Sequence, residues 1–222
     1  MAFCYRQIGK NDKALDKLNE LEKMGEKKYA KREKVLVLKN LQQFEEATEL
    51  AKENDYSYSE NPYHIQAFFE CLINTYSKVP DRIQLAELLC RLGRIQSEKA
   101  QSMYGRCKAL YFAYVDQEYD AALREIDKVI AEFPKDKKYA LTVKFEIALK
   151  FREVDVKEAV IKKLEEEKSN SNYVVICKSK LMAVRGDVEG AVKYFSASIA
   201  YFPEKSKAAF YNQLRGYGYA LV

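Results

Sequence analysis

Apolar residues recur three or four positions apart along most of the chain, as they do on the buried face of an α-helix. Phe44, Ala47 and Ala51 follow this spacing, and similar triplets return at intervals down to the C-terminal region. Only 8 Gly and 4 Pro are present among 222 residues, and a sheet would need more turn residues than these. The pattern therefore predicts an all-α chain of helices joined by short turns.

The helices are expected to form pairs, each made of a first helix and a second helix. The first helix of each pair is predicted at five places, each followed by a short turn and a second helix: 27–40, 63–77, 96–115, 139–151 and 172–184. Asp81, Asp155 and Asp187 lie at or near the starts of second helices, where a carboxylate can cap free backbone amides. Partial first helices are predicted at both ends, over 2–8 and 206–222.

A small residue recurs at the centre of the second-helix triplets. Two antiparallel helices approach closely where a side chain as small as alanine sits at their crossing. The six central residues are separated by 33, 39, 36, 37 and 32 positions: Ala14, Ala47, Ala86, Ala122, Ala159 and Ala191. Such regular spacing predicts repeated helical hairpins that stack on one another.

The segment 185–203, which reads RGDVEGAVKYFSASIAYFP, resembles the second half of a tetratricopeptide repeat. It has a Gly-Asp turn, a small Ala191, an aromatic residue four positions later and a closing Pro203, and segment 116–134 repeats much of this pattern. The family repeat is about 34 residues long. The resemblance implies a right-handed TPR-like α-solenoid of antiparallel helix hairpins, forming one array over residues 1–222 with about five complete helix pairs and partial ends. The apolar last segment implies a fragment of a longer protein, or a helix that docks on a second copy.

Charge and cysteine content narrow the class of protein. The 38 basic and 33 acidic residues give a net charge of +5 but are interspersed, which is typical of solvated helix faces rather than of a nucleic-acid surface. No apolar run approaches the roughly 20 residues that span a bilayer. Five cysteines without a CxxC motif argue against disulfides and structural zinc, and predict buried small side chains. We expect a soluble, cytoplasmic protein.

The sequence holds no recognisable catalytic constellation. His64 is the single histidine, which removes multi-histidine metal sites, and neither GxxxxGK[ST] nor GxGxxG is present. Cys90 and Cys107 have no neighbouring base that spacing alone identifies, so core packing is the preferred interpretation of both. The prediction is a protein that is not an enzyme and that binds neither a cofactor nor a metal.

In the resembling family the first helices line a concave, partner-binding face. Carried over to this chain, that pattern implicates seven residues in a basic, aromatic groove: Tyr104, Lys108, Tyr111, Lys144, Arg152, Tyr173 and Lys180. The alternative is that the tyrosines pack between repeats and the lysines are merely solvated. The Lys/Asn carboxylate clamp of chaperone-binding members is not reproduced, because Tyr111 and Ala148 stand where an Asn would help.

The expected function is that of a protein–protein interaction scaffold or sensor module that binds a partner protein or an acidic peptide. Two alternatives remain open from the residues. One is a nucleic-acid-binding helical repeat, supported by the sequence pI of about 8.7 and the interleaved Tyr and Lys. The other is a homodimerisation module of a larger regulatory or defence protein, which would associate through the Tyr-rich C-terminal helix.

Overall fold

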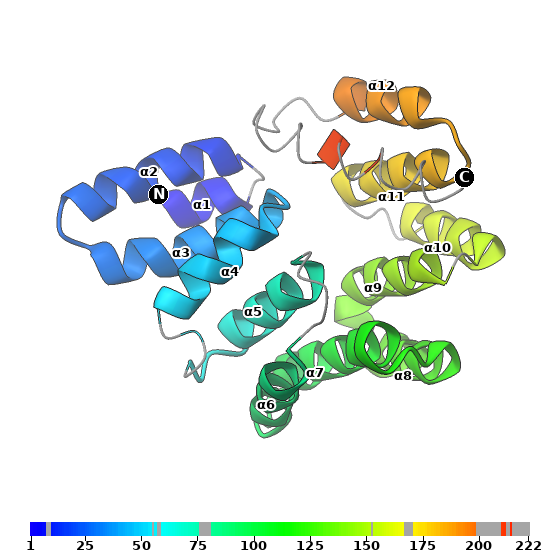
Figure 1. Ribbon diagram of the computed structural model, residues 1–222, viewed down its shortest axis with the longest axis horizontal. Helices are drawn as coiled ribbons and strands as arrows, with labels where there is room; N and C mark the ends of the chain where they lie inside the picture. Colours follow the sequence, from blue (N-terminus) through cyan, green and yellow to red (C-terminus); the bar gives the residue numbers. More distant parts are fainter. Residues whose placement is uncertain are drawn as a thin grey trace. The chain divides into compact units, whose positions relative to one another are not determined.

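The computed structural model describes residues 1–7, 10–54, 56, 59–75, 81–151, 153–166, 171–198, 210, 211 and 214. All regular secondary structure in these residues is helical (Figure 1), which confirms the all-α prediction. None of the described helices combines the length and the apolar character needed to cross a membrane. The chain divides into two compact units, unit 1 (Met1–Ile95 and Tyr201–Phe210) and unit 2 (Gln96–Ala200 and Tyr211–Val222).

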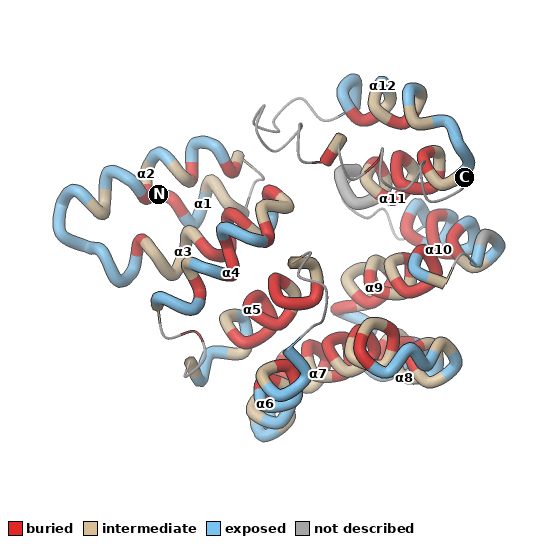
Figure 2. The backbone as a smooth tube through the Cα atoms, viewed as in Figure 1, coloured by how far each residue is buried: buried red, intermediate tan, exposed pale blue. Residues whose placement is uncertain are grey.

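Unit 1 is a succession of short helices in which each helix packs against the next. In chain order they are α1 (Ala2–Gln7), α2 (Asn11–Lys23), α3 (Lys27–Asn40), α4 (Phe44–Glu53), α5 (Pro62–Asn74) and α6 (Arg82–Gly93). α3 packs in addition against α5. In Figure 2 α5 is buried over most of its length, whereas α6 carries many exposed residues.

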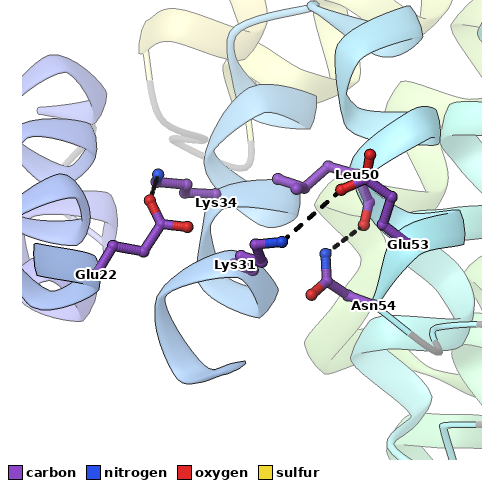
Figure 3. A network of polar contacts seen from close by, with 6 residues as sticks. All are labelled: Glu22, Lys31, Lys34, Leu50, Glu53 and Asn54. Carbon is purple, nitrogen blue, oxygen red and sulfur yellow. Dashed lines mark hydrogen bonds and ion pairs between the residues drawn. The ribbon is translucent and has the colours of Figure 1, made fainter. Parts of the chain in front are cut away.

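Side-chain contacts tie α3 to the helices on either side of it. Figure 3 shows Lys34 of α3 donating to Glu22 of α2, and Lys31 of α3 paired with Glu53 of α4 at 3.8 Å. The Asn54 side chain donates to the Leu50 carbonyl at 2.6 Å and satisfies one of the last carbonyls of α4. The same first helix therefore contacts second helices on two sides.

Unit 2 has the same kind of succession. Its elements are α7 (Glu98–Tyr111), a π-helix η2 (Phe112–Asp116), α8 (Tyr119–Glu132), a 3-10 turn η3 (Pro134–Asp136), α9 (Lys137–Lys150), α10 (Val154–Glu166), α11 (Ser171–Val184) and α12 (Val188–Ser198). α9 packs against α8 and α10, its neighbours in the sequence, and also against α7 and α11. A cluster that includes Leu141, Phe145, Leu164 and Cys177 forms the core between α9, α10 and α11.

Most predicted helices lie where the sequence placed them. α3 spans the predicted residues 27–40, and α11 begins one residue before the predicted 172–184. Asp81 accepts a hydrogen bond from the Gln84 amide at 3.0 Å, and Asp187 accepts one from the Gly190 amide at 2.9 Å, so two of the three predicted caps are present. The third residue, Asp155, lies in the first turn of α10. The predicted helix over 206–222 falls almost wholly outside the described residues. The single array over residues 1–222 stays a prediction, because each unit is described by itself.

The predicted register of the small residues is right in four second helices and wrong in two. Ala14, Ala47, Ala122 and Ala191 are fully buried. Ala86 and Ala159 are exposed, and they therefore do not lie at helix crossings. In α6 the buried residues are instead leucines, Leu85, Leu88 and Leu92. Ile83, Ala86 and Cys90, which have the same three- and four-residue spacing as Phe44, Ala47 and Ala51, are exposed.

The physical reason for the error in α10 is the position of its large apolar residues. Val160, Ile161 and Leu164 are buried and Val156 packs on the same cluster, and at roughly 100° per residue they surround position 157 rather than position 159. Burying these four side chains outweighs burying one alanine. Lys157 consequently sits in the centre of the buried face, fully shielded from solvent.

Lys157 occupies the place that a buried alanine holds in α2, α4, α8 and α12. The buried set Ala122, Ile126 and Val129 of α8 recurs 35 positions later as Lys157, Ile161 and Leu164 of α10. Its ammonium group has no hydrogen-bond partner in the described part of the chain, and burial lowers the pKa of Lys157 below that of an ordinary lysine. Burying an unpaired charge is unfavourable, so the Lys157 side chain lowers the stability of the core in which it lies.

The cysteines are only partly as predicted. Cys71, Cys107 and Cys177 are buried, and burial raises the pKa of Cys71 to about 12. Cys4 and Cys90 are exposed, so the expectation of core packing is wrong for these two. For Cys90 the cause is the rotated register of α6.

Candidate binding site where the first helices meet

Polar and aromatic side chains join α9 to both of the first helices that it contacts. We call this surface of unit 2 the first-helix seam. It is defined by nine residues of α7, η2, η3, α9 and α11: Lys99, Arg106, Tyr114, Asp136, Lys138, Tyr139, Glu146, Lys150 and Lys180. All of them lie within unit 2.

At one end of the seam three cations surround a single aromatic ring. The Lys99 Nζ, Arg106 Cζ and Lys138 Nζ atoms lie 5.1, 5.4 and 4.9 Å from the centroid of the Tyr139 ring. Each is within the roughly 6 Å over which a cation is attracted to a ring face. Arg106 is only 5% exposed, so its guanidinium is held inside the structure rather than in solvent.

Asp136 supplies a negative charge at this end. Its Oδ1 atom accepts a hydrogen bond from Lys99 Nζ at 2.5 Å, although the carboxylate is buried. Burial alone would raise the pKa of Asp136, but the hydrogen bond from Lys99 and the positive charges of Lys99 and Arg106 outweigh it, and the pKa is lowered. Asp136 therefore stays ionised and fixes the position of Lys99.

The middle and the far end of the seam are built from two further contacts. Lys180 of α11 donates to Glu146 Oε1 of α9 at 2.7 Å, and the Lys180 side chain is only 4% exposed. Lys150 at the end of α9 lies over the ring of Tyr114 in η2, with its Nζ atom 4.9 Å from the centroid. Lys150 itself is exposed, so its charge is available to a ligand.

Positive charge therefore exceeds negative charge along the seam. Its nine residues include five cations and two carboxylates, together with the rings of Tyr114 and Tyr139. Arginine and lysine side chains bind carboxylates and phosphates, and tyrosine rings add contact area at little entropic cost. A surface of this kind can bind an extended acidic segment.

The described members of the predicted set of seven make different contacts. Lys108 donates to Glu125 of α8 at 3.0 Å and lies over the rings of Tyr104 and Phe112, and Lys144 donates to Asp127 of α8 at 2.6 Å. These two lysines thus reach toward a second helix instead of across the seam.

The other predicted residues have mixed outcomes. Lys180 lies in the seam, and Tyr104 and Tyr111 are half-buried on α7. Tyr173 belongs to the first turn of α11, but its side chain is not among those described, and Arg152 lies outside the described residues.

Of the nine residues of the seam, sequence reasoning named only Lys180, and it missed Arg106 and Tyr139, which contact each other across α7 and α9. A weak signal existed for each of them. Arg106 is a charged residue set between the small residues Gly105 and Cys107, which are buried, and Tyr139 directly follows a run of lysines. Neither signal indicates a partner on another helix.

A second hollow lies in unit 2 over α10 and α11. It has a volume of about 490 Å³, and its walls include Ile161, Leu181 and Tyr194. Two ion pairs border it, Lys178 with Glu165 at 2.5 Å and Arg185 with Glu158. With Lys162, which also lines it, the hollow has three cations and two carboxylates, so its excess of positive charge is smaller than that of the seam.

His64 lies near the start of α5, where its contacts are structural. Its Nδ1 atom lies 3.0 Å from Ser59 Oγ and its ring packs 4.7 Å from that of Tyr56. Burial, and then the charges of Arg32 and Arg6, lower the pKa of His64. Among the described residues no group of three His, Cys, Asp or Glu side chains is placed to hold a metal ion.

Comparison of the chain with protein-family models, with curated proteins and with solved structures finds no match. The functional interpretation therefore depends on the geometry and chemistry of the seam.

Proposed function

We propose that the chain is a TPR-like interaction scaffold that binds an acidic segment of a partner protein along the first-helix seam of unit 2. The observation that carries the proposal is the charge of the seam, five cations against two carboxylates, arranged beside two tyrosine rings on helices that are far apart in the sequence. A rigid helical framework holds these groups ready for a ligand, which lowers the entropic cost of binding.

The packing of the helices supports the TPR-like part of the proposal. First helices contact one another, α3 with α5 and α9 with both α7 and α11, as expected when hairpins stack with their first helices on one side. With the corrected positions Leu85 and Lys157, the central residues of the second helices are 33, 38, 37, 35 and 34 positions apart. Gly105 of α7 also supports a close hairpin, because a Cβ atom there would overlap Val129 of α8.

The distribution of charge favours a peptide over a nucleic acid. A nucleic-acid strand presents phosphates at regular intervals and is bound by unbroken rows of cations. In the seam, the carboxylates of Asp136 and Glu146 interrupt the cations. Carboxylates repel phosphates but can accept hydrogen bonds from peptide amides, so a mixed acidic peptide fits better.

A titration of fluorescein-labelled peptides of about 15 residues, rich in Glu and Leu, tests the proposal by fluorescence anisotropy. Lys150→Glu should weaken binding about tenfold, since it reverses an exposed charge of the seam. Lys163→Glu is the matched control, because Lys163 is equally exposed but lies on α10, and it should change the affinity less than about twofold.

Two results would contradict the proposal. One is an equal loss of affinity in the seam variant and the control variant. The other is tighter binding of a single-stranded oligonucleotide of about 20 nucleotides with a steep dependence on salt, which would favour the nucleic-acid alternative.

A further inference from the structure

We propose that the hollow over α10 and α11 is a second binding site of unit 2. It takes one large apolar side chain of a partner protein, such as phenylalanine, together with an acidic residue next to it in the partner sequence. The lining residues of α11 are three, four and seven positions apart and therefore share one face: Lys178, Leu181, Met182 and Arg185. Lys180 of the first-helix seam lies roughly 200° around the helix axis from Lys178. The hollow therefore goes beyond the proposed function, since it faces another side of α11.

Ion pairs close the hollow at both ends. Glu165 of α10 pairs with Lys178 at 2.5 Å, and Glu158 of α10 pairs with Arg185. The two carboxylates are seven positions apart on α10, and so are the two cations on α11, which places the pairs about 10 Å apart along the helices. A partner helix laid lengthwise would run into both pairs, whereas a single side chain fits between them.

The floor between the ion pairs is apolar. Ile161 and Leu181 lie halfway between the pairs on their helices, and each is only 7% exposed. Met182 and Tyr194 of α12 line the hollow at half-buried positions. The volume of about 490 Å³ is within the range of pockets that hold ligands. A large apolar side chain that enters leaves water for this surface, which supplies most of the binding free energy.

The rim of the hollow favours an acidic neighbour beside the apolar side chain. Lys162 lines the hollow and is exposed, and it forms no ion pair in the part of the chain that the structure describes. Glu158 and Glu165 are each paired with a cation of α11, so one positive charge is left over. One carboxylate of the partner neutralises that charge.

A protein segment fits the hollow better than a free small ligand does. The four side chains of the end pairs are between 37% and 52% exposed, so the hollow is open to solvent above its floor. A free ligand would leave one side in water, whereas the peptide backbone that carries the apolar side chain covers the opening. Side chains that enter a pocket in this way, with surrounding contacts that exclude water, dominate the affinity of many protein interfaces.

The test uses three peptides of about 9 residues in a Gly and Ser background, measured by isothermal titration calorimetry with the whole chain. The first has one Phe between two Glu residues, the second has Ala in place of Phe, and the third has Gln in place of both Glu residues. The Phe peptide should bind about tenfold more tightly than the Ala peptide, since it buries a ring. It should bind about threefold more tightly than the Gln peptide.

Adjacent lysines of α10 give a matched pair of variants. Lys162→Glu reverses the unpaired charge of the rim and should weaken the Phe peptide about fivefold. Lys163 is equally exposed but does not line the hollow, so Lys163→Glu should change the affinity less than about twofold.

Tyr194 separates the apolar contact from the charge. Tyr194→Ala removes one wall of the hollow and should weaken the Phe peptide about fivefold, whereas Tyr194→Phe keeps the ring and should bind as the unchanged chain does. Helical circular dichroism checks that both variants are folded.

NMR of the backbone amides locates the bound Phe peptide and distinguishes the two proposals. Shifts at Lys162 and Met182 that persist in Lys150→Glu would support the hollow even if the seam bound nothing. If a peptide rich in Glu and Leu binds and Lys150→Glu weakens it, while the Phe peptide causes no shifts at the hollow, the second site is wrong and the proposed function stands.

Three further results would overturn the second site. The Phe and Ala peptides would bind equally, or Lys162→Glu and Lys163→Glu would weaken the Phe peptide equally. The third is a mass that rises with protein concentration and that Lys162→Glu restores to that of one chain, because a second copy of the chain would then occupy the hollow.

Discussion

Unit 1 and unit 2 join their first helices with different balances of charge. In unit 1, Arg6 of α1 pairs with Glu33 of α3 at 3.2 Å, and Lys39 of α3 pairs with Glu70 of α5 at 2.6 Å, so each cation meets one carboxylate. In unit 2 the equivalent surface has five cations and two carboxylates. The same kind of helix packing is thus accompanied by balanced ion pairs in unit 1 and by more cations than carboxylates in unit 2, and the proposed function assigns this difference to ligand binding.

The largest effect on stability is expected from breaking an ion pair of unit 2 whose lysine is buried. Glu146→Gln takes from the buried Lys180 the carboxylate to which it donates, and should lower the free energy of unfolding by about 3 kcal/mol. In unit 1, Glu70→Gln should cost about 1 kcal/mol, because Lys39 and Glu70 are each about one-fifth exposed. Urea unfolding measures both values.

The control for this pair is an exposed bridge of unit 2. Glu165→Gln removes the partner of Lys178, and since both side chains are more than one-third exposed it should change stability by less than about 0.5 kcal/mol. If all three substitutions lowered the free energy of unfolding by the same amount, the burial of an ion pair would not determine its contribution to stability.

The next largest effect is expected from enlarging alanines of the second helices, which tests in both units which face of each helix is buried. Ala47→Leu in unit 1 and Ala122→Leu in unit 2 each enlarge a fully buried side chain, and each should lower the free energy of unfolding by about 2 kcal/mol. Ala86→Leu and Ala159→Leu introduce the same side chain on exposed faces and should cost less than about 0.5 kcal/mol. A cost at Ala159 as large as that at Ala122 would restore the register that the alanine spacing predicted.

Replacing Lys157 should raise the stability of the protein, whereas the preceding substitutions should lower it. Unit 1 has Ala47 at the corresponding place, whereas unit 2 has a buried lysine with no hydrogen-bond partner in the described residues. Lys157→Met should raise the free energy of unfolding by about 1 kcal/mol at neutral pH, because it replaces a buried charge with an apolar chain of similar length. Thermal or urea unfolding would show this gain.

The pH dependence of the free energy of unfolding tests independently whether the charge of Lys157 destabilises the fold. Burial lowers its pKa in the folded state below the ordinary 10.5, so between these two values the unfolded state binds more protons and stability rises with pH. The penalty is fully present below the folded pKa and is lost as the pH approaches 10.5. The advantage of the methionine variant should therefore shrink over that window. An advantage that is constant with pH would show that the cost lies in packing rather than in charge.

The smallest effect is expected at the turns between paired helices. Gln42 in unit 1 and Gln117 in unit 2 have backbone φ angles of 60° and 62°, which glycine adopts at lower cost than glutamine. Gln42→Gly should stabilise by about 0.5 kcal/mol. Gln117→Gly should gain less, because the Gln117 side chain donates to the Tyr114 carbonyl at 2.8 Å and this bond would be lost. A larger gain at Gln117 than at Gln42 would contradict this account.

The sequence predicted the local structure better than the contacts between helices. Helix bounds such as those of α3, and caps such as Asp81 and Asp187, depend on neighbouring residues and were correct. The register failed at Ala86 and Ala159, because a search for alanines ignored the leucines and valines that decide which face of a helix is buried.

The site was predicted only in part for a related reason. The predicted repeat placed the candidate site on first helices, and Lys180, which lies in the seam, was among the predicted residues. Lys144 was assigned by spacing along one helix, but its side chain pairs with Asp127 of the preceding second helix. Arg106 and Tyr139 meet across two helices separated by 33 positions, and the sequence pattern of either helix alone does not reveal such a contact.

The π-helix η2 at the end of α7 has a consequence for how the repeats vary in length. One π turn holds one residue more than an α turn, so it turns every later side chain by roughly 100° relative to an uninterrupted α-helix. Tyr114, which contacts Lys150, lies inside this turn. A single-residue insertion in an ancestral helix would produce such a turn and could bring a new side chain onto the binding surface while the rest of the hairpin kept its packing. Differences in spacing between hairpins can therefore lie in the helices as well as in the loops.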